Sequence, residues 1–444
     1  MKLGSKCLIA NEYGNYVILS KEEYLKYTSQ KPDKALFAKL EANDIIITKA
    51  NRQRAINRYR DSKKQIFQGT SLHIIIPTRR CNLSCIYCHS PIAGANELQY
   101  DMQKKTAEKT VDFIFQSPAK NITIEYQGGE PLLNFNIIKE TVLYAKKLAK
   151  SKRKLLKFTI VTNLAAMDEE KMLFLLKQEV WPCISLDGPK KLQDKNRPNS
   201  YKYIQKWAPL LQKKTNGMLS GICIITRESL KYSKEILEAY KKFGFKKIWI
   251  QPFHALGSAK KNYPRISYTA KDYIAFWKKT ITHIIEKKIP LQEISSTFLL
   301  RKLIKKENPL YVDLQSPCGA VINQLAYEYD GSIYSCDEGR MVDSDIFKVG
   351  SVDMKYTDVV KSPESCSIIG MSVNDLLFCC KCAFKPFCGV CPVIAFASNK
   401  TPIPKPDNFE CKILKAQFTF LLEKYHENPD YRRIFEEWIS TKDL

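Results

Sequence analysis

The chain is organised around residues 72–88, LHIIIPTRRCNLSCIYC. The first part of this stretch, 72–77, is apolar and rich in isoleucine, which predicts a buried β-strand. Three cysteines follow it, Cys81, Cys85 and Cys88, with Cys-x3-Cys-x2-Cys spacing. In sheets built from parallel strands, reactive groups lie at the carboxyl ends of the strands. This loop is therefore the first candidate for a functional site.

Five further apolar, β-branched runs repeat the first one downstream, and helical patterns separate them. Strand–helix units of this kind predict a parallel sheet with right-handed crossovers. About 200 residues of such units suit an α/β fold of partial (β/α)6 TIM type. The strands are expected at 72–77, 122–126, 158–161, 183–186, 222–225 and 248–250, and the helices near 102–117, 135–150, 168–178, 201–214, 230–242 and 270–287.

The chain divides into three regions by pattern. Residues 1–68 predict a small α+β unit with a hairpin, a helix that begins with the capping box of Ser20 and Glu23, and a short strand at 44–48. Residues 69–300 hold the strand–helix units. In residues 301–444 cysteines at short spacing replace the periodic pattern, which indicates a small domain stabilised by metal, and a helix is expected over 411–440.

Composition narrows the class of protein. The first residues lack the apolar run of a signal peptide, and no apolar stretch approaches the ~18 residues of a membrane span, so we expect a cytoplasmic protein. In a reducing compartment, 15 cysteines are more often metal ligands or catalytic groups than disulfides. The net charge of +25 fits either a solvated lysine-rich surface or a surface for nucleic acid or an acidic peptide. Because the lysines are scattered along helical stretches and no RNA-recognition signature is visible, nucleic acid is not expected as a partner.

The three-cysteine loop indicates an iron–sulfur cluster with one open iron. Its thiolates can ligate three irons of a [4Fe–4S] cubane, whereas an electron-transfer cluster needs four protein ligands. An open position is where a catalytic metal site binds its substrate. Two alternatives are a zinc knuckle that adds His89 to the three cysteines, and a non-catalytic iron–sulfur electron carrier.

Polar and glycine residues follow the next strands and are expected at the same end of the sheet. Glycines allow the backbone to approach a ligand closely, and a glutamate after them can accept a hydrogen bond from an ammonium group. An arginine follows the fourth strand, and polar groups at the ends of such strands usually line the site. These candidates are Gly128, Gly129 and Glu130 after the second strand, Thr162 and Asn163 after the third, and Ser185 and Arg197 at and after the fourth.

The cysteine loop, with Tyr87 before its last cysteine, resembles the motif of the radical S-adenosylmethionine (SAM) superfamily. The resemblance implies that the open iron binds SAM and that an electron, from a donor such as flavodoxin or ferredoxin, splits SAM into methionine and a 5′-deoxyadenosyl radical. It also implies that residues 128–130 bind the SAM amino group, Ser185 the ribose and Arg197 the carboxylate. Tyr87, Thr162 and Asn163 would complete the cofactor site.

The cysteines of the C-terminal region resemble a SPASM domain, which carries two auxiliary [4Fe–4S] clusters. The family usually has three residues between the last cysteine pair and this chain has two, 389–390, so the partition between clusters stays open. Asp337 follows a cysteine at the place where sulfatase-maturing relatives have a catalytic base. Zinc sites are the alternative, since four-cysteine zinc sites also use Cys-x2-Cys. The resemblance assigns Cys318, Cys336 and Cys391 to the first auxiliary cluster and Cys379, Cys382, Cys388 and Cys411 to the second.

Stretches at 70–74, 122–135, 311–317, 330–334 and 337–341 resemble the radical SAM maturases of the His-Xaa-Ser peptide system. This resemblance implies a ribosomally made precursor peptide as substrate, a crosslinked or oxidised side chain as product, and a second radical SAM maturase as partner. Residues 1–68 would then either recognise a leader peptide by strand addition or cap the barrel. The alternatives are an anaerobic sulfatase-maturating enzyme, which makes formylglycine, and an RNA-modifying radical SAM enzyme.

Overall fold

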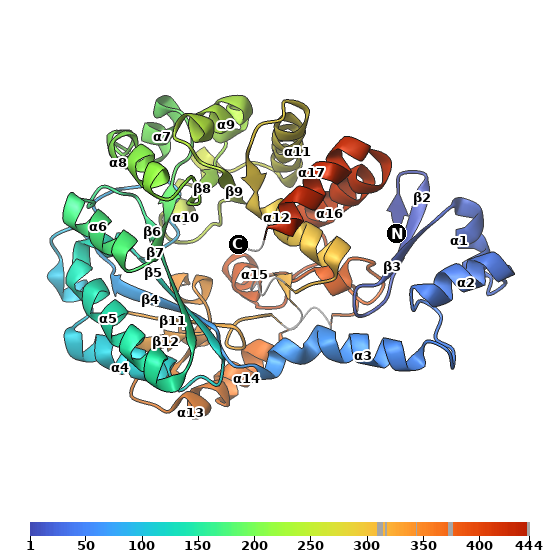
Figure 1. Cartoon of the computed structure of the whole chain (residues 1–444), viewed down its shortest axis with the longest axis horizontal. Helices are drawn as coiled ribbons and strands as arrows, with labels where there is room; N and C mark the ends of the chain where they lie inside the picture. Colours follow the sequence, from blue (N-terminus) through green and yellow to red (C-terminus); the bar gives the residue numbers. More distant parts are fainter. Residues whose placement is uncertain (309–313, 316–317, 343, 372–375, 442–444) are drawn as a thin grey trace.

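Two sheets organise the computed structural model, which describes residues 1–308, 314–315, 318–342, 344–371 and 376–441. The small sheet has the order β1-β2-β3, and the large one has the order β10-β9-β8-β7-β6-β5-β4-β11-β12-β13. Figure 1 shows the large sheet curving with helices on its outer side, and the small sheet at the opposite end of the molecule. No helix within the described ranges combines the length and the apolar character needed to cross a membrane.

The six predicted strands are confirmed, and each pairs in parallel with the next. A two-residue strand that the sequence pattern missed, β10, adds to the edge of β9 in parallel. These strands are β4 (Leu72–Thr78), β5 (Asn121–Gly128), β6 (Leu155–Thr162), β7 (Val180–Ser185), β8 (Ser220–Ile225), β9 (Lys247–Pro252) and β10 (Gln292–Glu293).

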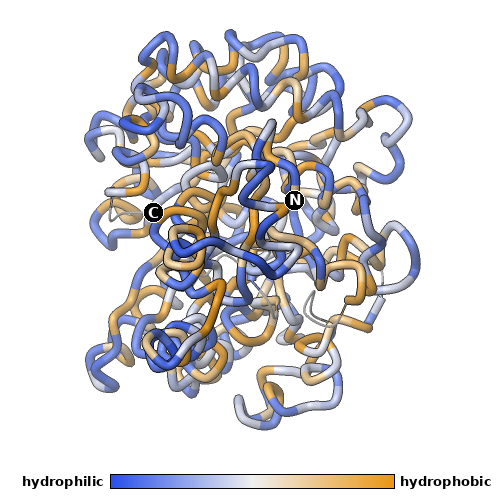
Figure 2. The backbone as a smooth tube through the Cα atoms, turned by 90° about the vertical axis from the view of Figure 1, so that its right-hand side faces the viewer, coloured by the Kyte–Doolittle hydropathy of each residue, from blue (hydrophilic) through white to orange (hydrophobic). Residues whose placement is uncertain are grey.

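The helices between the strands also follow the predicted pattern, with three additions that were not expected. Hydrophilic and apolar residues alternate along the outer helices (Figure 2), as they do in helices with one buried face. The predicted helices are α4 (Lys104–Ile114), α5 (Phe135–Lys152), α6 (Glu169–Lys177), α8 (Tyr201–Lys214), α9 (Ser233–Lys242) and α11 (Ala270–Glu286), and the additional ones are α7 (Lys190–Asn196), α10 (Gly257–Ile266) and α12 (Ile294–Leu300).

Burial alternates along β5 and so distinguishes the two faces of the sheet. Ile124 and Tyr126 are fully buried, and the Tyr126 hydroxyl lies 2.8 Å from Thr141 Oγ1 on α5. Glu125 and Gln127, which alternate with them, are only partly covered. The first face therefore packs against helices, while the second lines the concave inner space of the barrel, called the lumen below.

The C-terminal region is joined to the barrel through the sheet itself. Strand β11 (Gln324–Tyr327) pairs in parallel with β4, and β12 (Ser332–Tyr334) and β13 (Lys348–Ser351) continue the sheet in antiparallel fashion. Helices α13 (Tyr356–Val360), α14 (Pro363–Gly370) and α15 (Pro392–Asn399) follow. Most of the stretch 311–317, used above for the family resemblance, lies outside the described residues.

The chain ends in two helices, α16 (Phe409–Glu427) and α17 (Pro429–Ser440), so the prediction of one helix over 411–440 was wrong. Asn428 interrupts the helix because its side chain accepts hydrogen bonds from the amides of Asp430 and Tyr431, which caps α17. Pro429 then occupies the first helical position, where its missing N–H costs nothing.

The N-terminal unit forms the predicted hairpin and capping box, but the predicted strand at 44–48 is absent. Asp44 has a positive φ of 55° and a buried carboxylate that binds Arg54 and Arg58, so the chain turns there instead of extending. The elements are β1 (Lys2–Leu3), β2 (Lys6–Ala10), β3 (Tyr16–Leu19), α1 (Lys21–Thr28), α2 (Lys34–Ala42) and α3 (Arg52–Lys63).

The junction between β4 and β11 predicts an acid-sensitive fold. His73 on β4 is fully buried, its Nε2 donates to Thr70 O (3.1 Å), and its Nδ1 accepts from the Tyr327 hydroxyl (2.7 Å). Burial lowers the pKa of His73 to about 3. Because histidine in the unfolded chain titrates near 6.5, the unfolded state binds more protons below that pH, and stability falls as the pH drops from about 6.5 toward 3.

We expect the free energy of unfolding of His73→Gln to depend less steeply on pH than that of the wild type. The slope should be smaller by up to about 1.4 kcal/mol per pH unit, because one titrating group is removed. Anaerobic urea unfolding of both chains between about pH 7 and pH 5 measures the two slopes. Identical slopes would contradict this assignment.

Candidate functional site

The three-cysteine loop is held from two sides by the helices that the sequence pattern missed. The amide of Ile86 donates to Asn196 O (2.9 Å) at the end of α7. On the other side, α10 supplies the amide of Ala259 to Cys88 O (3.2 Å) and the side chain of Asn262 to Ile86 O (2.8 Å). The backbone of the loop is thus positioned by hydrogen bonds from both neighbouring helices.

The thiols of this loop are partly buried and receive polar hydrogens. Burial raises the pKa of Cys81 to about 12 and that of Cys85 to about 11. Asn163 Nδ2 lies 3.9 Å from the Cys81 sulfur, and Arg197 Nη1 lies 4.0 Å from the Cys85 sulfur. Donors aimed at cysteine sulfurs are the outer contacts that tune iron–sulfur clusters, so this donor set fits a three-cysteine cluster. Among the described residues, no three His, Cys, Asp or Glu side chains lie close enough together to share a single metal ion.

A buried ion pair supports the loop from below. The Tyr87 hydroxyl donates to Asp187 Oδ2 (2.6 Å), Arg197 Nε lies 3.3 Å from the same oxygen, and the guanidinium lies 5.1 Å from the centre of the Tyr87 ring. Asp187 and Arg197 are 0% and 8% exposed. Sequence reasoning read Asp187 only as part of an Asp-Gly turn, although its position after the fourth strand was a usable signal.

The two glycines allow β4 and β5 to end in contact. A Cβ atom at Gly128, whose φ is +131°, would lie 2.4 Å from Thr78 O, and one at Gly129 would lie 2.1 Å from Arg80 O. The cysteine loop and the Gly-Gly turn therefore touch through their backbones, which requires glycine at both positions.

Glu130 follows these glycines as a buried carboxyl group with neutral partners. Its oxygens accept hydrogen bonds from Thr162 Oγ1 (2.8 Å) and from the amides of Asn163 (2.8 Å) and Leu132 (3.1 Å). Burial raises its pKa to about 7, and within the described part of the chain no lysine or arginine forms an ion pair with it. Since buried carboxylates need a cation, the site suits an ammonium group from a ligand. Ser185 lies at the end of β7, 5% exposed.

Four C-terminal cysteines share one neighbourhood. The pKa of Cys388 is raised to about 12 by burial and by the nearby thiols of Cys411, Cys382 and Cys379. The adjacent Cys380 is exposed and separate. The structure thus brings together the set assigned to the second auxiliary cluster. Lys302, also buried, contacts this region and has its pKa lowered to about 7 by burial.

Cys318, Cys336 and Cys391, the set assigned to the first auxiliary cluster, are all buried. The segment after Cys318 bonds to the segment before Cys336 through Val321 N and Ser335 O (2.9 Å). Helix α15, which follows Cys391, packs against the turn after Cys336. The three cysteines are therefore carried by neighbouring segments.

Asp337 lies in a buried network of charges that reaches the cysteine loop. Arg340 Nε lies 2.8 Å from Asp337 Oδ1, and its Nη1 lies 3.1 Å from Ser90 Oγ, two residues after Cys88. Glu328 pairs with Arg79 (2.9 Å) and lies 3.6 Å from Arg340. The network balances two arginines with two carboxylates and fixes Asp337 beside the cluster loop.

A cavity of about 110 Å³ opens between the end of β9 and α16. Gln251, His254 and Cys391 line it, and the ring of His254 stacks on that of His89 at 6.4 Å. His254, which sequence reasoning took for an ordinary residue, thus borders the site.

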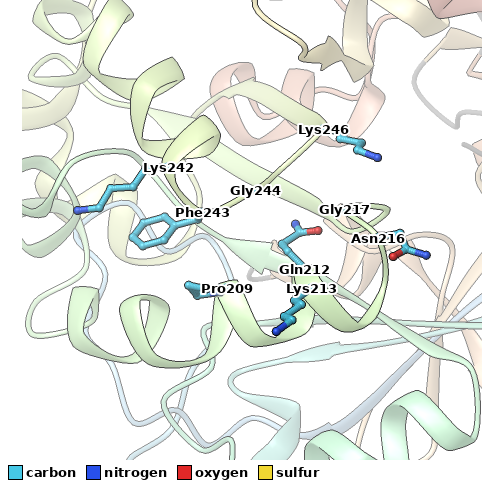
Figure 3. Close-up of a pocket in the computed structure, with 9 residues that line it drawn as sticks. All are labelled: Pro209, Gln212, Lys213, Asn216, Gly217, Lys242, Phe243, Gly244 and Lys246. Atoms are coloured by element: carbon cyan, nitrogen blue, oxygen red, sulfur yellow. The ribbon is translucent and has the colours of Figure 1, made fainter.

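A larger pocket of about 440 Å³ lies elsewhere, at the ends of α8 and α9 (Figure 3). Lys213, Lys242 and Lys246 line it beside Phe243. It lies at the amino-terminal end of β9, away from the cysteine loop, and its lining carries no cysteine, histidine or carboxyl group, so it is not the candidate site.

Residues 75–251 match the Radical SAM superfamily model. Among curated relatives, a cysteine-type anaerobic sulfatase-maturating enzyme of Clostridium novyi is 24% identical over 367 residues, 79% of this chain and 95% of the relative. The radical SAM cyclopropyl synthase TigE of Paramaledivibacter caminithermalis is 25% identical over 45% of this chain and 46% of its own length.

Two solved structures share the fold. AnSMEcpe with bound AdoMet aligns with a TM-score of 0.69 at 20% identity, over 82% of this chain and 99% of its own. Streptococcus suis SuiB bound to S-adenosylmethionine aligns with a TM-score of 0.60 at 16% identity, over 91% of this chain and 98% of its own. The predicted fold class, SAM and the [4Fe–4S] cluster are confirmed by these comparisons together with the family match.

Gly129→Ala is expected to disrupt the site, because the new methyl group would overlap backbone oxygen that cannot move away cheaply. We expect SAM affinity to fall at least about tenfold, as the cysteine loop is displaced. Equilibrium binding of SAM to the reconstituted protein measures this. Gly370→Ala, where nothing lies within 4 Å of the new atom, is the matched control. Equal affinities in the two variants would contradict the contact.

Asp187→Asn should cost about 3 kcal/mol of stability, because it leaves the buried Arg197 charge uncompensated. Asp353→Asn, which breaks an ion pair whose carboxyl is 66% exposed, should cost under about 1 kcal/mol. Thermal unfolding and iron content of both variants test the difference. If both variants lost a similarly small amount of stability, the idea that Asp187 supports the cysteine loop would be wrong.

Proposed function

We propose that this radical SAM enzyme is a maturase that modifies a residue of a ribosomally made peptide, with two auxiliary clusters in its C-terminal region. One observation carries the proposal. Arg340 joins Asp337, next to a cysteine of the C-terminal region, to Ser90, next to the SAM-cluster loop. The contact between the Cys336 segment and the cysteine loop supports a shared space, in which an extended substrate would meet both centres.

Different residues of the chain would bind the cluster and SAM. Cys81, Cys85 and Cys88 would hold the cluster, and Glu130 would receive the SAM ammonium as its missing cation. The bound cluster and SAM supply a 5′-deoxyadenosyl radical for hydrogen-atom abstraction. The barrel around them excludes water from that chemistry.

The remaining site residues would orient SAM. Arg197, fixed by Asp187 through Nε, holds Nη1 beside the Cys85 sulfur, where it would meet the SAM carboxylate. Ser185 would contact the ribose and Asn163 the cluster side of the ligand, as Asn163 already bonds toward Cys81. Asp337 would take up a substrate proton, with Arg340 holding its carboxylate in place.

The C-terminal cysteines would hold two auxiliary [4Fe–4S] clusters, which relay an electron or bind the substrate at an open iron. Support comes from the shared neighbourhood of Cys379, Cys382, Cys388 and Cys411, whereas the first set has three cysteines only. Cys391 also lines the cavity at the end of β9, so a peptide side chain there would meet both centres.

A peptide substrate is supported by the fold shared with structures solved with peptides, SuiB with its precursor peptide SuiA and anSMEcpe with the peptide Kp18Cys. The finer proposal is a His-Xaa-Ser precursor, with a second radical SAM maturase and a flavodoxin or ferredoxin donor as partners. The N-terminal unit would recognise the leader through the open edge of β3. Lys39 already binds Ile18 O at that edge (3.1 Å), so an added strand would have to displace it.

Sulfatase maturation is the second candidate function, in which a Cys or Ser side chain becomes formylglycine. It is favoured by the position of Asp337 directly after Cys336 and by the relatives named sulfatase-maturating enzymes, which align over nearly their full length. Mass spectrometry separates the two candidates, since only this one converts a sulfatase peptide to an aldehyde.

Cys85→Ala is expected to abolish both 5′-deoxyadenosine formation and modification of a co-expressed precursor peptide encoded beside this chain. The reason is that two thiolates cannot replace three around the cluster. Cys366→Ala, which changes an exposed thiol, should keep both activities. Liquid chromatography and mass spectrometry of anaerobic reactions give both readouts. Peptide modification that survives in the Cys85 variant would overturn the proposal.

A further inference from the structure

The inner face of β5 carries a carboxyl group within the lumen, Glu125. It stands two residues before Gln127 on the same face and five residues before Glu130. Its neighbours Ile124 and Tyr126 are fully buried under the outer helices, whereas Glu125 keeps partial access to the lumen. Glu125 is thus a wall residue of the space in which a substrate would be held.

Neutral donors alone hold this carboxylate. Gln127 Nε2 donates to Oε1 (2.6 Å) and Thr159 Oγ1 donates to Oε2 (2.8 Å), from the register position opposite Glu125 on β6. Within the described residues, no lysine, arginine or histidine forms an ion pair with it. Both oxygens are therefore oriented, but the negative charge has no counter-ion.

The other buried carboxylates of the site differ in this respect. Asp187 is paired with Arg197, and Asp337 with Arg340. Asp337 is the charged group that acts on Glu125 across the lumen, and its effect is repulsive; burial and this repulsion raise the pKa of Glu125. A carboxylate that is only partly open to water and has no paired cation is costly, so a cation bound beside Glu125 would be favoured.

We propose that Glu125 binds the cationic nitrogen of a basic side chain in the substrate peptide and thereby selects which residue enters the lumen. This inference rests on the proposed function, because it takes the substrate to be a peptide. A lysine or arginine side chain carries its charged nitrogen at the end of a flexible apolar stem, which suits it to a carboxylate on the wall of the lumen. The hydrogen bonds from Gln127 and Thr159 leave the remaining lone pairs of both oxygens for that nitrogen.

The test compares blocked tripeptides as probes, N-acetyl-Gly-Lys-Gly-amide and its arginine analogue against the neutral norleucine analogue. Each is titrated calorimetrically into the reconstituted holoenzyme with SAM and without reductant. We expect the basic probes to bind at least about tenfold more tightly than the norleucine probe, as charge-assisted hydrogen bonds are among the strongest. Glu125→Gln, which keeps the shape of the side chain, should bring that ratio close to one.

Two controls keep the result specific. Glu169→Gln removes a carboxylate from the exposed first turn of α6 and should leave the ratio unchanged. Thr159→Val removes one hydrogen bond but no charge, so it should preserve a preference for basic probes. Without probe, Glu125→Gln should unfold at a temperature no lower than the wild type, because it relieves an unpaired buried charge.

The proposal is overturned if the wild type does not discriminate, if no probe binds, or if Glu125→Gln retains the preference. Because no turnover is needed, its fate is separable from that of the proposed function. A preserved binding preference with no peptide modification would reject only the maturase role, and modification of a peptide without this preference would reject only the role of Glu125.

Discussion

The structure depends on the burial of charge and thiols at the carboxyl end of a parallel sheet. Cys81, Cys85 and Cys88, the proposed cluster ligands, would have to bind iron as thiolates, yet burial raises the pKa of Cys81 and Cys85 far above neutrality. The surrounding fold favours the thiolate forms in two ways. Asn163 and Arg197 direct hydrogen-bond donors at the sulfurs, and α7 and α10 fix the backbone of the loop. A bound cluster would complete the deprotonation of these thiols, since a coordinated thiol is deprotonated.

Burial at this end of the sheet also requires that each charged side chain lie close to an opposite charge. Arg197 is matched by Asp187, and Arg340 with Arg79 by Asp337 and Glu328. Glu130 and Glu125 are held by neutral donors instead. The balanced pairs serve the architecture of the site, while the two carboxylates without a paired cation are where a cationic ligand group would be stabilised.

The C-terminal region is an extension of the barrel sheet. Because β11 pairs with β4, the strand that leads into the cysteine loop has neighbours from both regions. Glu328 follows β11 just as Arg79 follows β4, and their ion pair fixes the two strand ends together. A displacement of the Cys336 segment relative to the cysteine loop would therefore disturb both this ion pair and the sheet.

The sequence by itself determined the six parallel strands, the cysteine loop and the Gly-Gly-Glu turn, because these rest on local periodicity and on short spacing of chemically distinctive residues. It missed α7, α10 and the break at Asn428, where the signal was a single capping residue or a short amphipathic run. The sequence pattern also predicted a strand at 44–48, which is absent. The chain turns there between two helices, and the ion pairs of Asp44 with Arg54 and Arg58 hold the turn.

Only the tertiary structure decided which side chains share a space. Asp187 becomes an anchor because β7 ends beneath Tyr87, and Glu125 becomes a lumen residue because the pleat of β5 turns it inward while Ile124 faces the helices. Arg340 meets Ser90 across 250 residues of sequence. Contacts of this kind depend on how the strands are ordered and curved, and no local pattern in a single chain encodes that order.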